Sequence, residues 1–192
     1  MMQFKNLTYS FFAIVLAVFT TSALSAQDGN PPREVGIQFS SLDFDGGGGF
    51  SAFFKKQKKE NVYRRIRFFY GNISVGEQRE EFQFDVSTGI AIGREKRKML
   101  DSKLEFYQGP EFALRLDVSS FLETQSQISV TPSFGWVLGL QHSFNERWAV
   151  NLETIPGASI SFYANTNDED SRSLNFNAGL KNAVLIGLVR KF

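Results

Sequence analysis

Residues 127–144 read QISVTPSFGWVLGLQHSF. Every second side chain in this stretch is large and mostly apolar, including Ile128, Phe134, Trp136 and Leu140. The side chains between them are small or polar, with Val137 as the one exception. Successive side chains of a β-strand point to opposite faces, so an alternation with a period of two predicts a strand. One face of this strand is apolar and the other is small and polar.

The same alternation recurs along most of the chain. It is clear in residues 82–93, 104–119, 148–164 and 175–192, where Leu185 and Val189 break it, and it is weaker in residues 35–42, 50–57 and 63–75. The clear segments are much longer than the roughly 5 or 6 residues of an ordinary strand. A tilted strand that crosses a bilayer needs about 9 to 11 residues, which these segments supply. We therefore expect eight membrane-crossing strands, with ten as the alternative count.

The composition of the polar face decides between a membrane barrel and a soluble sheet. In a soluble antiparallel sheet the polar face meets water and is rich in charged residues and Thr. Here that face is rich in Gly and Ser and carries isolated charges of both signs, which is typical of a crowded interior. The predicted fold is an all-β, antiparallel up-and-down transmembrane β-barrel. A soluble sandwich or lipocalin-like barrel is the alternative.

The beginning of the chain has the layout of a secretory signal. Lys5 precedes an apolar run over residues 11–19, and small residues follow over residues 20–26. The apolar run is shorter than the roughly 20 residues of a membrane-spanning helix. We expect residues 1–26 to be a cleaved signal peptide and residues 27–192 to form one barrel domain.

Composition excludes several classes of function. The chain of 192 residues has no Cys, which rules out disulfides, thiol chemistry and Cys-ligated metals. Its 21 basic and 20 acidic residues nearly cancel, so no nucleic-acid partner is indicated. No motif points to a cofactor. The four-residue stretches at 43–46 and 167–170 are acidic, but neither has the ligand spacing of an EF-hand loop.

The last strand supports an outer-membrane assignment. Ile186, Leu188 and Phe192 match the outward apolar positions of the C-terminal signal by which bacterial outer-membrane barrels are assembled, while Arg190 departs from it. Residues 107–112 (YQGPEF) and 143–148 (SFNERW) are similar to segments of Bacteroidota barrels. The chain from residue 27 onward thus resembles a small outer-membrane barrel of the OmpA transmembrane-domain or OmpX type. The resemblance implies a monomer in the bacterial outer membrane, with outer-membrane lipids, periplasmic chaperones and the barrel-assembly machinery as partners.

An eight-stranded barrel with both ends in the periplasm has a fixed topology. Connections near residues 43–49, 76–81, 120–126 and 165–173 would face outside, and those near 58–62, 94–103 and 145–147 would face the periplasm. The outer set is acidic. The periplasmic set is basic, and we assign Lys55, Glu95 and Arg97 to it. Basic turns would lie against anionic headgroups of the inner leaflet.

The interior of such a narrow barrel is filled by side chains. The charged residues that the alternation directs inward are Arg65, Arg67, Asp85, Glu105, Glu111, Arg115, Asp117 and Glu153. Buried charges must be paired, so we predict a lumen filled by ion pairs. A narrow porin-like channel is the alternative, because an open bore would need a ring of one sign.

Two further sets of residues complete the prediction. Four aromatic residues are expected in the girdle at the membrane interface, namely Trp136, Phe144, Trp148 and Phe162. His142 and Ser143 are adjacent, which places them on opposite faces of a strand and argues against a catalytic pair. We therefore expect a structural or surface-interaction role with no catalytic residues. A lipid-modifying enzyme is the second alternative.

Overall fold

The computed structural model of the chain describes residues 31–40, 49–78, 81–121, 125–165, 172–180 and 184–192. The expected signal peptide lies outside the described residues, as do the acidic stretches at 43–46 and 167–170. No helix in the described part of the chain is long and apolar enough to cross a membrane.

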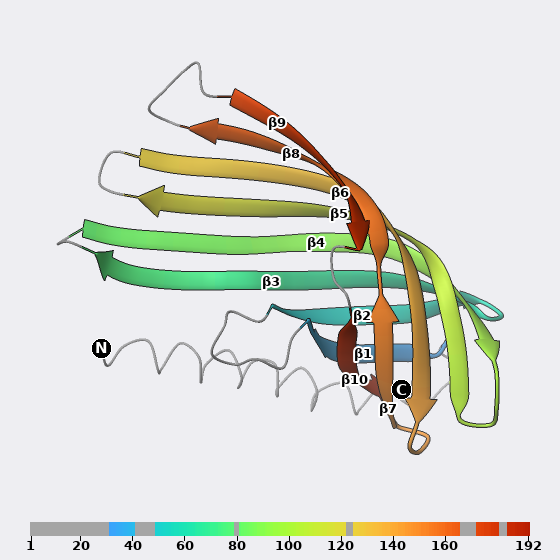
Figure 1. The fold of residues 1–192 in the computed structure, drawn as a ribbon. Coiled ribbons are helices and arrows are strands. Elements are labelled where there is room, and N and C mark those ends of the chain that lie inside the picture. The colour runs from blue at the N-terminus through green and yellow to red at the C-terminus, as the bar shows by residue number, and fades with distance from the viewer. Residues whose placement is uncertain (1–30, 41–48, 79–80, 122–124, 166–171, 181–183) are drawn as a thin grey trace.

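The described residues form a single antiparallel sheet (Figure 1). Its strands are β1 (Arg33–Phe39), β2 (Phe50–Lys59), β3 (Val62–Gln78), β4 (Glu81–Met99), β5 (Leu104–Phe121), β6 (Gln125–Ser143), β7 (Trp148–Thr154), β8 (Pro156–Asn165), β9 (Arg172–Leu180) and β10 (Leu185–Lys191).

The strand pairing closes the sheet into a barrel with eight strand positions around its wall. We call each position a stave. Strands β7 and β8 form one stave interrupted at Ile155, because both pair with β6. Strands β9 and β10 form the last stave, since β9 pairs with β8 and β10 pairs with β7. Closure comes from β10, whose other edge pairs with β1 from Glu34↔Lys191 to Phe39↔Ile186. The predicted eight-stranded antiparallel barrel is confirmed by this pairing, and the alternative of ten staves is not.

Strand β1 begins and strand β10 ends at the same end of the barrel, which we call the turn end. There the Arg33 amide donates a hydrogen bond to the Phe192 carbonyl, with N and O 3.2 Å apart. The connections after β2, β4 and β6 lie at the same end and are short. Asn61 makes the first of them with a φ of 57°, a left-handed conformation that Asn tolerates better than most residues.

The apolar face of the strands is the outer face. In β6, Phe134 and Trp136 are each 44% exposed, whereas Val137 and Gln141 are fully buried. Gly135 and Gly139, which share the inner face, are buried as well. The two faces of the predicted alternation are therefore confirmed in this strand, with the small and polar residues on the inside.

Strand β4 is longer than predicted. It continues to Met99, so the connection expected over residues 94–103 is only the stretch between Met99 and Leu104. The assignment of Lys55, Glu95 and Arg97 to periplasmic turns is wrong, because all three lie within strands and are buried in the lumen. Side chains still point alternately inward and outward there, but residues 94–98 are charged on both faces, so a pattern of hydrophobicity does not register the continuation of the strand.

The two apolar exceptions in the last strand have a structural role. Leu185 is buried with Tyr107, Val137 and Ile155. Val189 is buried with Phe53 and Ala149. Both side chains point into the lumen, where they form small apolar clusters beside the polar residues.

Candidate functional site: the lumen charge network

Arg65 of β3 is fully buried in the lumen and contacts three carboxylates. Its Nη1 and Nη2 donate to the two carboxylate oxygens of Glu153, at 3.0 and 2.7 Å. Its Nε lies 3.0 Å from Glu111 Oε2, and its Nη1 lies 3.5 Å from Glu95 Oε2. The paired hydrogen bonds to Glu153 have the fork geometry in which an Arg binds a carboxylate most strongly.

Arg97 of β4 is a second centre, nearer the turn end. Its Nη1 and Nη2 donate to the two carboxylate oxygens of Glu34, at 2.8 and 2.7 Å. The same guanidinium donates to Glu95 and, at 3.0 Å, to Glu105. Glu95 therefore links the two centres, because it contacts both Arg65 and Arg97.

Lys55 and Tyr107 fill the space between the two centres. The Lys55 ammonium lies 3.0 Å from Glu95 Oε2 and 4.3 Å from the centre of the Tyr107 ring. The Tyr107 hydroxyl donates to Glu153 at 2.8 Å and accepts a hydrogen bond from Asn151 at 3.1 Å. A cation over an aromatic face is attracted by the ring quadrupole, which offsets part of the cost of burying it.

The network is neutral and spans the whole bore. Five acidic residues, Glu34, Glu95, Glu105, Glu111 and Glu153, are joined by ion pairs to five basic ones, Lys55, Arg65, Arg67, Arg97 and Lys191. Gln141 of β6 donates to Glu34 at 3.1 Å, and Asn151 of β7 donates to Tyr107. Every one of the eight staves thus contributes a side chain. We call these ten charged residues, with Tyr107, Gln141 and Asn151, the lumen network.

Five of the charged residues expected in the lumen lie in this network. They are Arg65, Arg67, Glu105, Glu111 and Glu153. Arg115 and Asp117 instead pair with each other at 2.7 Å, farther from the turn end, with side chains 52% and 31% exposed. Asp85 is half-buried on β4, beyond the level of that pair.

The other half of the network was not expected from the sequence. Glu34, Glu95, Arg97 and Lys191 lie toward the ends of their strands, and Lys55 lies within β2 next to the basic residue Lys56. The available signal was the phase of the strand, because Glu95 and Arg97 keep the inward phase of Ala91 and Gly93.

His142 and Ser143 lie on opposite sides of the barrel wall. His142 is exposed and its ring meets the edge of Phe144, with centroids 5.7 Å apart. The Ser143 hydroxyl accepts a hydrogen bond from the Lys191 ammonium at 2.7 Å. These positions do not bring the two side chains together. Among the described residues no group of three His, Asp or Glu side chains is arranged to hold a metal ion.

The expected girdle residues lie at different heights. Phe144 and Trp148 flank the turn after β6, whereas Trp136 lies in the middle of that strand. Phe162 is on β8, toward the opposite end, and is 48% exposed. The expected assembly positions Ile186 and Leu188 are exposed on β10, and Phe192 is half-buried beside Arg190, whose guanidinium lies 5.0 Å from its ring centre.

Comparison with known proteins yields matches of structure alone. No protein-family model matches the chain, and neither does any curated protein sequence. The N-terminal β-barrel domain of Pseudomonas aeruginosa OprF has 11% identity and a TM-score of 0.49, covering 86% of this chain and 100% of the domain. Neisserial surface protein A has 13% identity and a TM-score of 0.47, covering 84% and 95%. Ail, the attachment invasion locus protein of Yersinia pestis, has 10% identity and a TM-score of 0.48, covering 85% and 100%. The chain is similar to small outer-membrane β-barrels, the class that its sequence resembles.

Proposed function

We propose that this protein is an outer-membrane β-barrel with a structural or surface-interaction role, and that its lumen is closed to solutes. One observation carries the proposal: the barrel is apolar outside and polar inside. This is the reverse of a soluble protein, and it is the arrangement that a lipid environment stabilises.

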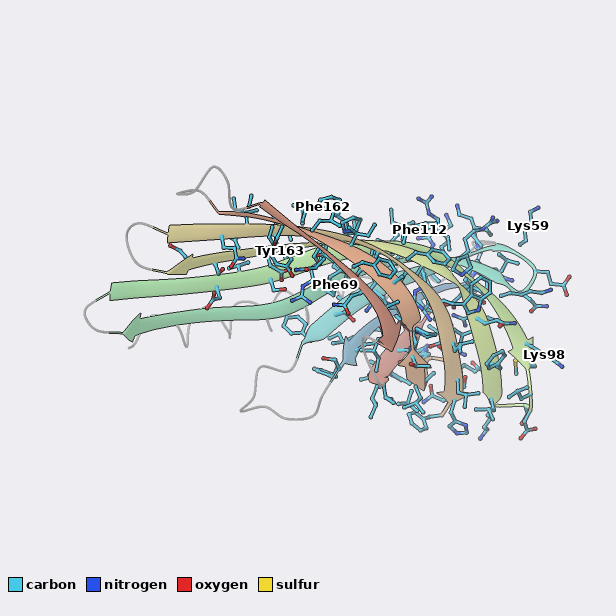
Figure 2. All side chains as sticks on the ribbon, turned by 45° about the horizontal axis from the view of Figure 1, so that its top comes forward. Lys59, Phe69, Lys98, Phe112, Phe162 and Tyr163 are labelled. Carbon is cyan, nitrogen blue, oxygen red and sulfur yellow. The ribbon has the colours of Figure 1, made fainter. Side chains whose placement is uncertain are left out.

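The outer surface supports residence in a membrane. Large apolar side chains are exposed on every stave, among them Phe39, Phe54, Phe68, Ile92, Phe112, Phe134, Leu152 and Leu188. Phe112, labelled in Figure 2 on the outside of the barrel, is 65% exposed. A soluble monomer rarely exposes a continuous apolar surface of more than a few hundred Å². Hydrocarbon around the barrel removes this surface from water.

The lumen network supports a closed barrel. A conducting pore needs a continuous water-filled path, often lined by charges of one sign. Here the side chains of the lumen network, which come from all eight staves, occupy the bore, and Arg65, Lys55 and Tyr107 at its centre are fully buried. The remaining role is to occupy the membrane and to present the connections at the far end.

The proposed absence of catalysis rests on side-chain placement. His142 points outward while Ser143 is held by Lys191 inside. A serine hydrolase needs both groups on one side, within hydrogen-bond reach. The described lumen residues are joined in ion pairs to one another, which leaves them poorly suited to act on a substrate.

Gel mobility tests the membrane barrel. The protein extracted from membranes is run on a denaturing gel with and without boiling. A folded barrel resists the detergent and migrates faster when unboiled, so we expect two distinct bands. An identical mobility for the two samples would contradict the proposed fold in membranes.

Conductance tests the closed lumen. The folded protein is inserted into planar bilayers and the current is recorded at fixed voltage. We expect no stepwise increases in current after insertion. Reproducible single-channel steps would contradict the closed lumen and would indicate that the protein is a narrow channel.

A further inference from the structure

A row of cations crosses the outer face of the barrel near the turn end. Lys56 of β2 is directly opposite Arg64 of β3, and Arg64 is directly opposite Arg94 of β4. We call these three residues the basic row. Arg64 and Arg94 are exposed and Lys56 is half-buried. Residues directly opposite each other in antiparallel strands have Cβ atoms about 4.5 to 5.5 Å apart, so three like charges are held side by side.

The described residues provide no counterion for this row. No ion pair within 4.0 Å joins Lys56, Arg64 or Arg94 to a carboxylate in the part of the chain that the structure describes. The nearby carboxylates Glu95 and Glu111 point inward, where the lumen network engages them. Like charges in register repel and destabilise a sheet. An external anion at this position would relieve that repulsion.

An apolar row runs immediately above the basic row. Phe54, Ile66, Ile92 and Phe112 are in register across β2, β3, β4 and β5. Phe54, Ile66 and Ile92 each lie two positions from the basic row along their strands, which corresponds to a separation of about 7 Å. Phe112 extends the apolar row onto β5, directly opposite Ile92. The boundary between apolar and cationic surface on this side is therefore sharp, as at the edge of a hydrocarbon layer.

A hollow connects the two rows. It has about 440 Å³ of open space, with Lys58, Arg64 and Arg94 on one side and Ile92, Pro110 and Phe112 on the other. The pairing of β4 with β5 is interrupted here, between Gly93↔Glu111 and Lys96↔Gln108. Pro110 has no amide hydrogen to donate to the ladder. The hollow is thus lined by cationic side chains on one side and by apolar side chains on the other.

We infer that this hollow binds an anionic glycerophospholipid of the adjoining leaflet. Its phosphodiester group would lie against Arg64, Arg94 and Lys58, and its acyl chains would lie along Ile92 and Phe112. A guanidinium pairs well with phosphate oxygens because its donors form a rigid fork. A free phosphate satisfies only the cations, whereas a lipid covers both surfaces. The inference rests on the proposed membrane location.

The test uses the purified protein in nanodiscs made of equal amounts of phosphatidylglycerol and phosphatidylcholine with the same acyl chains. Native mass spectrometry then counts the lipids that stay bound. We expect the protein to retain phosphatidylglycerol in preference. In the double variant Arg64→Gln and Arg94→Gln, the ratio of bound phosphatidylglycerol to bound phosphatidylcholine should fall about tenfold, because the variant lacks two of the cations near the phosphate.

The matched control is the double variant Lys98→Gln and Lys103→Gln. It makes the same change in charge at exposed positions near the turn that do not line the hollow. This control should keep the lipid preference of the unmodified protein. An equal loss in both double variants, or equal retention of the two lipids by the unmodified protein, would overturn the inference.

Two further measurements separate the remaining outcomes. Inorganic phosphate at the molar concentration of the lipid should not displace the bound phosphatidylglycerol; displacement would show a simple anion site and overturn the lipid assignment. Insertion is checked by gel mobility before each experiment. Failure to insert in either lipid contradicts the proposed function, whereas insertion without lipid preference contradicts only this inference.

Discussion

At the scale of the residue, Arg65 is the centre of the lumen network. It is fully buried and contacts Glu95, Glu111 and Glu153. Replacing it by Met keeps most of its volume but leaves the buried carboxylate of Glu153 without its ion-pair partner. Breaking a buried ion pair on one side costs about 3 to 5 kcal/mol. We expect Arg65→Met to lower the free energy of unfolding by that amount, measured by urea unfolding in lipid vesicles with tryptophan fluorescence.

Arg115 supplies the control for that prediction. It pairs with Asp117, but its side chain is 52% exposed. An exposed ion pair contributes about 0 to 1 kcal/mol, so Arg115→Met should change stability by no more than that. Equal losses for the two variants would contradict a special role for the buried network.

Gly139 is required by the close approach of Tyr107. A Cβ atom at this position would overlap the Tyr107 ring. The ring cannot turn away without losing its hydrogen bonds to Glu153 and Asn151. We expect Gly139→Ala to destabilise the barrel by about 1 to 3 kcal/mol, the usual cost of overpacking. The double variant with Tyr107→Leu should lose less than the sum of the two single variants in the same unfolding assay. Strict additivity would show that the two residues do not clash.

At the scale of the element, the outer face of β5 tests the depth of the strands in the membrane. Leu114 is 49% exposed and lies between Ile90 and Pro132 in the middle of the sheet. An Arg on the lipid face costs about 2 to 4 kcal/mol at the bilayer midplane and about 0 to 1 near the interface. We expect Leu114→Arg to destabilise the folded protein by about 2 to 4 kcal/mol. Leu100→Arg, in the turn after β4, should cost only about 0 to 1 kcal/mol. Folding equilibria in vesicles measure both, and similar costs would contradict the membrane position of β5.

The boundaries of the strands show how far the pattern of hydrophobicity reaches. Strand β6 was predicted closely, because its outward residues are apolar from Ile128 to Leu140. Strand β4 was predicted too short, because beyond Gly93 its outward residues are Arg94, Lys96 and Lys98. At that point the outer face leaves the apolar surface and becomes cationic. Side chains still point alternately inward and outward beyond Gly93, which places Glu95 and Arg97 in the lumen.

At the scale of the whole molecule, our proposal that the lumen network closes the barrel to ions can be tested directly. Arg65 and Arg97 each hold several carboxylates from different staves. Replacing both by Ser removes bulk and leaves an excess of negative charge in the bore. We expect planar bilayers with this double variant to show a small cation-selective current, and we expect none with the unmodified protein. The gel mobility of the variant confirms that it has folded, and a folded variant without current would indicate that other side chains close the bore.

The sequence by itself determined the class of fold and the faces of most strands. A period of two needs only neighbouring residues, and the placement of Phe134 and Trp136 outside and Gln141 inside follows from it. It also directed Arg65, Glu111 and Glu153 inward, because their phase is local. Only the tertiary structure decided which charges meet. Glu34 and Arg97 are far apart in the chain and come together because β1 and β4 face each other across a closed bore. The pairing of β2, β3 and β4 likewise decided that Lys56, Arg64 and Arg94 form one row, since register between strands is a property of pairing and not of any single segment.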